Sequence, residues 1–285
     1  MRKDNSRWLI LTDIHANLPA LEAVLATPEA RRCSRVISLG DQVNFGPKPR
    51  EVLQRLRGLD AILLRGNHED RLTRVDDFPG YGYGILRFTA EQTPGEDYAL
   101  PLDFRAGKAL FTHGTPGDPW HLVDAATVAP VLDTLPDGVT WLISGHNHVT
   151  WRVARGGRTA FNPGSVGVDE NGVGGMASFA VAEELDTAPR VTRFTVPYDV
   201  ERVRRDYLET GAAAACPEMT RAILQTMRTG EPWLGLRFAR FVAETAARLG
   251  LTPEDEAAWR EADLAFDGWT EKGVSAREVW GIGNA

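Results

Sequence analysis

Short apolar runs alternate with amphipathic stretches over the first two-thirds of the chain, and this alternation predicts an α/β fold. The expected strands are brief and apolar, as strands buried on both faces are, and lie at residues 8–11, 36–39, 61–64, 109–112 and 141–143. One amphipathic helix is expected after Asn17, whose side chain can cap it, with Pro19 in its first turn. A second is expected from Pro49 to Gly58, where a glycine suits the position just after the helix.

Later segments follow different spacings. Runs rich in apolar and β-branched residues are separated by glycine-rich turns and lie at 149–153, 158–161, 177–182 and 190–196. They predict a second, more antiparallel sheet. From Asp199 onward the spacing is helical, most clearly between Phe238 and Leu249, where apolar residues recur every three or four positions before Gly250.

This change of pattern divides the chain into two expected parts. Residues 1–198 are expected to form one domain, and residues 199–285 a helical C-terminal extension that its tryptophans pack onto the core. The same aromatic-rich helices also offer a surface for self-association, so a homo-oligomer formed through them is a second expectation.

Composition narrows the class of protein. Hydrophobic residues make up 43% of the chain and charged residues 25%, as in ordinary globular proteins. No apolar run approaches the roughly 18 to 20 residues that span a bilayer, and no secretory signal precedes the first strand, so we expect a cytoplasmic protein without a membrane partner. The two cysteines, Cys33 and Cys216, have neither disulfide-framework nor zinc-site spacing.

Net charge bears on the partner. A formal charge of −7 argues against a long nucleic acid, because proteins that bind one usually carry a basic face. A small phosphorylated substrate remains compatible with this charge, since bound cations would reverse its sign locally.

Five expected strands end in side chains that can bind metal ions. The segments are Asp13-Ile14-His15, Gly40-Asp41, Gly66-Asn67-His68-Glu69, His113-Gly114 and Gly145-His146-Asn147-His148. Five of the six histidines in the chain fall within them, which coincidence explains poorly. Open α/β sheets place their sites beyond the carboxyl ends of strands. Nitrogen and oxygen ligands without cysteine suit manganese, iron or zinc.

This ordered set of motifs resembles the calcineurin-like metallophosphoesterases over about residues 7 to 198. The stretch Asn162-Pro163-Gly164-Ser165 is similar to a loop of the bacterial members. The resemblance implies an α/β fold of four layers, an αββα sandwich in which helices cover two mixed sheets. It also implies two divalent metal ions, either Mn²⁺, Fe²⁺/Fe³⁺ or Zn²⁺, with Mn²⁺ as the first choice.

The resemblance also implies a role for each matching residue. One metal would be held by Asp13, His15 and His148, the other by Asn67, His113 and His146, and Asp41 would bridge the two. A hydroxide between the metals would attack phosphorus in line, and His68 would stabilise the transition state or protonate the leaving oxygen.

Two positions depart from the phosphoprotein phosphatases of this superfamily. Asn44 replaces an Asp that would orient the catalytic histidine, and Phe45 replaces an Arg that would grip phosphate. Phe45-Gly46-Pro47 is instead similar to bacterial phosphodiesterase-like members. We therefore favour hydrolysis of a small phosphodiester or nucleotide. A Ser/Thr phosphoprotein phosphatase is the alternative, supported by Arg65, and a non-catalytic scaffold is disfavoured because the ligand set is complete.

Substrate contacts are expected from Arg71, Trp120 and His121, which lie close in sequence to the motifs. For Arg71 an ordinary helix-surface position is the favoured alternative, and for Trp120 a packed loop position is an equal one. The segment 76–98 lies between two ligand motifs and is either part of a substrate cap or an irregular excursion.

Overall fold

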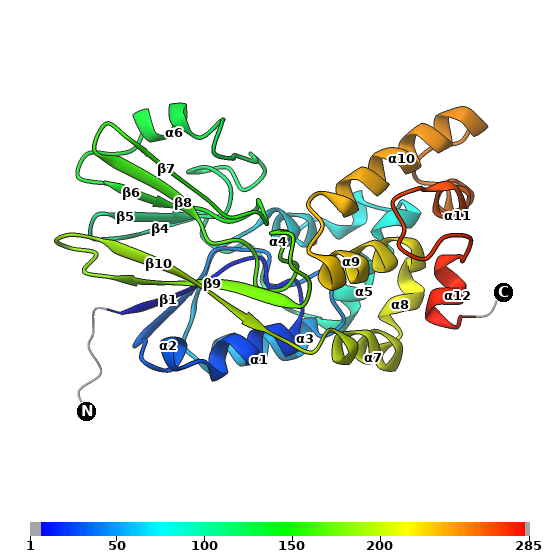
Figure 1. Cartoon of the computed structure of the whole chain (residues 1–285), viewed down its shortest axis with the longest axis horizontal. Coiled ribbons are helices and arrows are strands. Elements are labelled where there is room, and N and C mark those ends of the chain that lie inside the picture. Colours follow the sequence, from blue (N-terminus) through cyan, green and yellow to red (C-terminus); the bar gives the residue numbers. More distant parts are fainter. Residues whose placement is uncertain (1–6, 283–285) are drawn as a thin grey trace.

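The computed structural model describes residues 7–282 and places two five-stranded mixed sheets face to face (Figure 1). The first sheet has the order β10-β9-β1-β2-β3, with β1 at Trp8–Leu11, β2 at Arg35–Ser38, β3 at Ile62–Leu63, β9 at Met176–Glu183 and β10 at Arg190–Pro197. The second has the order β4-β5-β6-β8-β7, with β4 at Asp103–Ala106, β5 at Ala109–Thr112, β6 at Trp141–Ile143, β7 at Trp151–Arg155 and β8 at Arg158–Asn162.

Each sheet combines parallel and antiparallel pairs: antiparallel pairs lie at one edge of the first sheet, through β9 and β10, and at both edges of the second, through β4 and β7. The parallel pairs are β1 with β2, β2 with β3, β5 with β6, and β6 with β8. The prediction of a separate, more antiparallel sheet after residue 144 is wrong. β7 and β8 extend the sheet of β6, whereas β9 and β10 extend the sheet of β1, where Trp8 pairs with Ala182. Local spacing identifies strands and hairpins, but the edge to which a hairpin adds depends on tertiary packing.

Four layers result from this arrangement, as the resemblance implied. Apolar side chains from both sheets meet between them, including Ile10 and Ile37 against Phe111 and Ile143. Helices α1 (Leu18–Ala26), α2 (Pro28–Arg31) and α3 (Pro49–Arg57) lie on the outer side of the first sheet, and α6 (Ala129–Asp133) covers the second.

Most local predictions for the helices are confirmed. The Asn17 side chain caps α1 by accepting the backbone N–H of Ala20 at 3.1 Å. Gly250 ends α10 in the left-handed conformation that favours glycine. Gly58 follows α3 with φ −61° and is therefore right-handed, so this part of the prediction is wrong. The edge strand β4 was not expected, because its sequence Asp103-Phe104-Arg105-Ala106 carries two charged residues.

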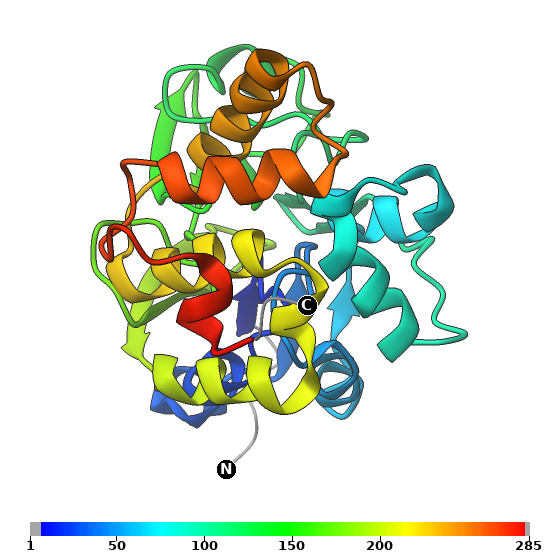
Figure 2. The same ribbon diagram turned by 90° about the vertical axis from the view of Figure 1, so that its right-hand side faces the viewer.

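The chain after residue 199 is helical. It contains α7 (Val200–Thr210), α8 (Ala212–Ala215), α9 (Pro217–Thr229), α10 (Leu234–Leu249), α11 (Glu256–Ala265) and α12 (Ala276–Trp280). Figure 2 shows these helices, coloured yellow-green to red, in front of the strands. Trp280 packs against Tyr207, and Trp259 and Trp269 pack against Phe238. Within residues 7–282, no helix combines the length and apolarity needed to cross a membrane.

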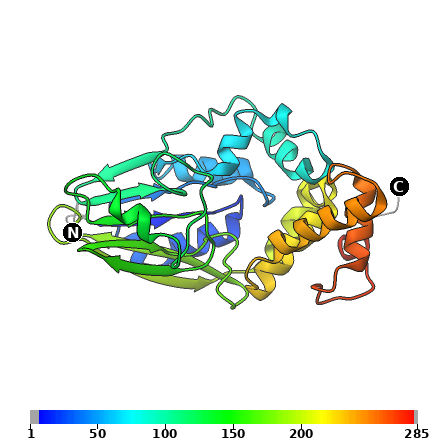
Figure 3. The same cartoon turned by 90° about the horizontal axis from the view of Figure 1, so that it is seen from above.

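The segment between β3 and β4 folds into short helices beside this C-terminal region. They are α4 (Asn67–Leu72), η1 (Val75–Asp77), η2 (Tyr81–Tyr83) and α5 (Gly84–Gln92). Seen from above, α5 in cyan and the yellow and orange helices lie beyond the same end of the sheets (Figure 3). Ile85 and Phe88 of α5 share an apolar cluster with Tyr207, Ile223 and Trp280.

Candidate metal centre

The predicted metal-binding side chains meet at the carboxyl ends of the central strands. Asp13 and His15 follow β1, Asp41 follows β2, Asn67 and His68 begin α4, His113 follows β5, and His146 and His148 follow β6. Parallel strands deliver these loops to one edge of each sheet, and the two sheets face each other. Most of the side chains are buried, so water contributes little to their solvation.

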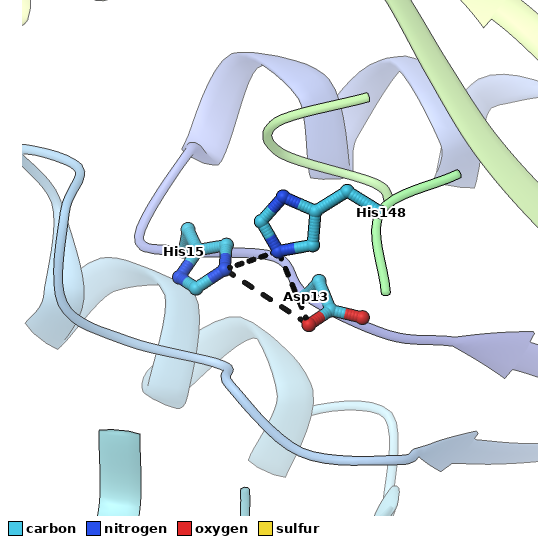
Figure 4. A group of neighbouring side chains, drawn as sticks. All are labelled: Asp13, His15 and His148. Carbon is cyan, nitrogen blue, oxygen red and sulfur yellow. Dashed lines mark hydrogen bonds and ion pairs between the residues drawn. The ribbon is translucent and has the colours of Figure 1, made fainter. Parts of the chain in front are cut away.

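One cluster consists of Asp13, His15 and His148 (Figure 4). The Nε2 atoms of the two histidines are 3.1 Å apart, and His148 Nε2 is 3.4 Å from Asp13 Oδ1. Ligand atoms from two loops thus converge on one point, as a metal site requires.

A second cluster consists of Asp41, His113 and His146. Asp41 Oδ2 lies 3.3 Å from His113 Nε2 and 3.9 Å from His15 Nε2, so this carboxylate faces both clusters. His68 Nε2 is 3.7 Å from the same oxygen. Asp41 therefore lies close to residues of both clusters.

The amide of Asn67 tests whether cations fit this centre. Its oxygen lies 3.1 Å from His113 Nε2, and it also faces Asp41 Oδ2 and His146 Nδ1. Acceptors this close repel one another unless a positive charge lies among them. The reversed amide would donate to all three and accept from Arg71. With His113 deprotonated, as a bound cation requires, the inward amide oxygen therefore fits a cation. Without a cation, either the amide nitrogen faces inward or a proton on His113 supplies the positive charge. The residues fit a divalent cation.

Burial and charge set the protonation states of the side chains. Burial lowers the pKa of His15 and of His146 to about 4, so both have a free nitrogen lone pair at neutral pH. Burial opposes ionisation of Asp13, but the hydrogen bond and positive charge of His148 lower its pKa to about 2. Burial likewise opposes protonation of His113, yet the Asp41 carboxylate raises its pKa to about 9. Bound cations would displace that proton.

The backbone of the site loops is strained. Among residues 7–282, ten non-glycine residues have positive φ, and seven of them lie in these loops: Asp13, His15, Ala16, Asp41, Asn44, Phe45 and His146. Left-handed conformations of such residues persist only where surrounding contacts enforce them. Here backbone bonds enforce them, including His15 N–H to the carbonyl of Asp41 at 2.9 Å.

Glycine is needed where two of the loops touch. A Cβ on Gly66 would lie 2.1 Å from Asp41 Oδ1, and one on Gly40 would lie 2.7 Å from both the Gly66 backbone and His113 Nδ1. Any side chain at either position would displace the Asp41 carboxylate or its neighbours.

Two glutamates support the centre and were not assigned roles from sequence. Glu69 accepts the backbone N–H groups of Asp41 at 2.7 Å and Gly66 at 2.9 Å, which fixes the loop that carries the bridging carboxylate. Glu170 lies 3.2 Å from His148 Nδ1 and orients that ring. Glu69 belongs to the motif Gly66-Asn67-His68-Glu69, so its sequence position already indicated that it lies near the centre. Glu170 lies in the loop between β8 and β9, where nothing in the local sequence indicated it.

His68 has neighbours that match the two departures from the phosphatase pattern. Asn44 Nδ2 lies 2.5 Å from His68 Nδ1, and the Phe45 ring lies 4.5 Å from the imidazole, centroid to centroid. Asn44 therefore holds the ring without supplying a negative charge. Burial lowers the pKa of His68 well below its ordinary value, which keeps the ring neutral.

The three expected substrate contacts have different positions. Arg71 lines a cavity beside the metal centre, and its Nε has no hydrogen-bond partner within residues 7–282. Trp120 lies against Arg71, with the guanidinium carbon 4.6 Å from the ring centroid, and its Nε1–H donates to Asp70 at 2.9 Å. His121 is exposed and does not line the cavity. The structure thus places Arg71 in the cavity lining. Trp120 contacts Arg71 but does not line the cavity, and neither does His121.

Comparison with known proteins identifies a family and two similar sequences. The family model of the calcineurin-like phosphoesterase superfamily domain matches residues 7–186. A protein named MJ0912 from Methanocaldococcus jannaschii is 26% identical over 221 residues, which cover 68% of this chain and 88% of that protein. Phosphodiesterase YfcE from Escherichia coli is 28% identical over 176 residues, which cover 58% of this chain and 82% of that one.

Solved structures extend the comparison. A metallophosphoesterase from Sphaerobacter thermophilus has a TM-score of 0.64 and 28% identity, covering 79% of this chain and 99% of its own. Protein PH1004 from Pyrococcus horikoshii has a TM-score of 0.63 with the same coverage, and at 19% identity it supports the fold alone. Since the family model spans well over half of the residues and the structural match reaches beyond it, the chain belongs to the calcineurin-like phosphoesterase superfamily and is a hydrolase of phosphoric esters.

Proposed function

We propose that this protein is a two-metal phosphodiesterase acting on a small phosphodiester or nucleotide. The observation that carries the proposal is the position of Asp41, whose Oδ2 faces His113 at 3.3 Å on one side and His15 at 3.9 Å on the other. The proposed ligands of one metal are Asp13, His15 and His148, and those of the other are Asn67, His113 and His146. Mn²⁺ is the proposed ion at both positions, ahead of iron or zinc.

The cations and the protein would divide the chemical work. When bound, two divalent ions neutralise charge on the phosphoryl oxygens and lower the pKa of a coordinated water. Arg71 contributes a guanidinium at the edge of the centre, where it can bind a further phosphoryl oxygen. His68, held through Nδ1 by Asn44, presents Nε2 to the site and can donate a proton or hydrogen bond to the leaving oxygen.

The preference for a diester rests on how few cationic side chains reach the substrate. Phe45 takes the position of a phosphate-binding arginine and packs against His15 and His68. Arg65, which supported the phosphatase alternative, instead donates to the carbonyl of Leu100 and to Asp70. A dianionic monoester loses more from this lack than a diester, which carries less charge. A non-catalytic scaffold would not need the strained, buried centre.

A substrate panel at equal Mn²⁺ load tests the proposal. It compares bis-p-nitrophenyl phosphate, cyclic nucleotides, p-nitrophenyl phosphate and a phosphoserine peptide by kcat/KM. We expect the diesters to be hydrolysed fastest. Preference for the phosphopeptide would establish the phosphatase alternative. If no ester were hydrolysed, the non-catalytic scaffold would be the remaining hypothesis.

A further inference from the structure

A cavity of about 540 Å³ opens beside the metal centre, and most of the residues that line it are apolar. His68, His146 and His148 line one end together with Arg71. The remaining walls come from η2, α5 and the C-terminal helices α9, α10 and α11. A volume of this size suits the organic part of a small ligand.

Exposed apolar side chains gather around this cavity. Tyr83, Leu122 and Leu236 are 37%, 40% and 47% exposed, although each is large and apolar. They come from η2, from the loop after β5 and from α10, and all three line the same cavity. Apolar surface brought together from three distant segments marks a place where a ligand displaces water.

Charge limits the ligand to a single phosphate. Arg71 is the one lysine or arginine among the residues that line the cavity within the described chain. Glu170 and Glu254 also line it, and they would repel a phosphate placed beyond the metal centre. A polyphosphate chain would find no cation to neutralise it there.

We propose that η2, α5 and the C-terminal helices form a specificity pocket for a substrate with one phosphate and a large apolar, aromatic or branched, ester group. This proposal rests on the proposed function and narrows its substrate class. Under it the segment 76–98, which supplies Tyr83, Ile85 and Leu86, is part of a substrate cap. The ester group would cover Tyr83, Leu122 and Leu236 and be shielded from water by them.

Calorimetric binding of phosphonates to the Mn²⁺-loaded protein tests the pocket without turnover. Phenylphosphonate and methylphosphonate carry the same charged group and differ in apolar size. We expect phenylphosphonate to bind about tenfold more tightly, as burial of a ring predicts. The double substitution Tyr83→Ser and Leu236→Ser should reduce this ratio to about one. Leu208→Ser with Leu264→Ser removes two exposed leucines outside the cavity and should leave the ratio unchanged.

Kinetics separate failure of the pocket from failure of the proposed function. The Tyr83→Ser and Leu236→Ser variant should raise KM for bis-p-nitrophenyl phosphate with little change in kcat. Hydrolysis by the natural protein together with equal binding of both phosphonates would overturn the pocket and leave the function. Selective binding of phenylphosphonate without hydrolysis of any ester would overturn the proposed function and leave the pocket. Faster hydrolysis of diadenosine tetraphosphate than of bis-p-nitrophenyl phosphate would also overturn the single-phosphate pocket.

Discussion

The carboxylate of Glu170 lies 3.2 Å from Nδ1 of His148, the histidine whose Nε2 points to Asp13. Its other oxygen accepts the backbone N–H of Trp233 at 2.7 Å, immediately before α10. Glu170 therefore connects the C-terminal helices to a proposed metal ligand. Since α10 also lines the cavity, Glu170 connects the position of this cavity wall to the orientation of the His148 ring.

Glu170→Gln should weaken Mn²⁺ binding by about 10- to 100-fold, because a neutral amide orients and polarises His148 less well than a carboxylate. Metal titration followed by calorimetry measures the change. Glu254→Gln is the matched control, since Glu254 lines the same cavity and makes no ion pair with a histidine within residues 7–282. Equal Mn²⁺ affinities for both variants would show that Glu170 does not support metal binding through His148.

Metal affinity should rise with pH. The folded pKa of His113 is about 9, above its ordinary value of 6.5, so at neutral pH the ring holds a proton that a cation must displace. We expect affinity for Mn²⁺ to increase about tenfold per pH unit for each proton displaced, up to about pH 9. Folding stability of the metal-free protein should change with pH in the opposite direction. Protonation of His113 stabilises the fold below pH 6.5, and this stabilisation is lost as the pH approaches about 9.

Calorimetry in buffers of different ionisation enthalpy counts the protons released on metal binding. His121→Asn removes the histidine that lies outside the site and should not change the count. Affinity that is independent of pH, with no proton release, would contradict the assigned protonation of His113.

Asn44 and His68 should act as one unit. His68→Ala removes the donor at Nε2 and should lower kcat by about 100-fold, within the range for general acid catalysis. Asn44→Ala leaves the ring without its partner and should cost about tenfold. The double variant should be no slower than His68→Ala alone, because Asn44 acts through the ring. Additive losses would show that Asn44 has a separate role.

Gly66→Ala should disable the centre. The added Cβ would meet Asp41 Oδ1 at 2.1 Å, and moving that carboxylate by about 1 Å should cost about 100-fold in kcat/KM. Gly58→Ala is the control, because the nearest atom to a Cβ there is 3.5 Å away and its φ is −61°. Full activity of Gly66→Ala would place the bridging carboxylate elsewhere.

Breaking a buried ion pair should strongly destabilise the C-terminal helices. Arg221 Nη1 donates to Asp263 Oδ1 at 2.9 Å, and both side chains are almost inaccessible to water. Asp263→Ala would leave the guanidinium buried without its partner and should cost about 3 to 5 kcal/mol of unfolding free energy. Glu22→Ala breaks the exposed pair with Arg55 and should cost less than about 1 kcal/mol. Urea denaturation measures both, and similar losses would contradict the account.

The sequence predicted the proposed ligands better than their support. Asp13, Asp41 and His113 each follow an apolar run, and parallel strands necessarily bring such positions to one edge. Glu170 could not be predicted, because its contact with His148 depends on how the β8–β9 loop crosses the end of the sheet. The left-handed φ of Asp13 and Asp41 was also invisible, since tertiary hydrogen bonds and not local preference enforce it.

The cavity illustrates the same limit. Apolar spacing between Phe238 and Leu249 predicted a packed helix, and most of those residues do pack. The spacing could not show that Leu236 and Tyr83, far apart in sequence, remain exposed in the lining of one cavity. The domain boundary at residue 198 and self-association through the C-terminal helices stay predictions.

The most direct test measures bound metal and diesterase activity together in the natural protein and in Asp41→Ala. After purification and reconstitution with Mn²⁺, elemental analysis of the natural protein should give about two ions per chain, as expected for a bridged centre. Asp41→Ala should hold fewer ions and lose nearly all hydrolysis of bis-p-nitrophenyl phosphate. Only trace metal in the natural protein, or undiminished hydrolysis by Asp41→Ala, would contradict the two-metal centre.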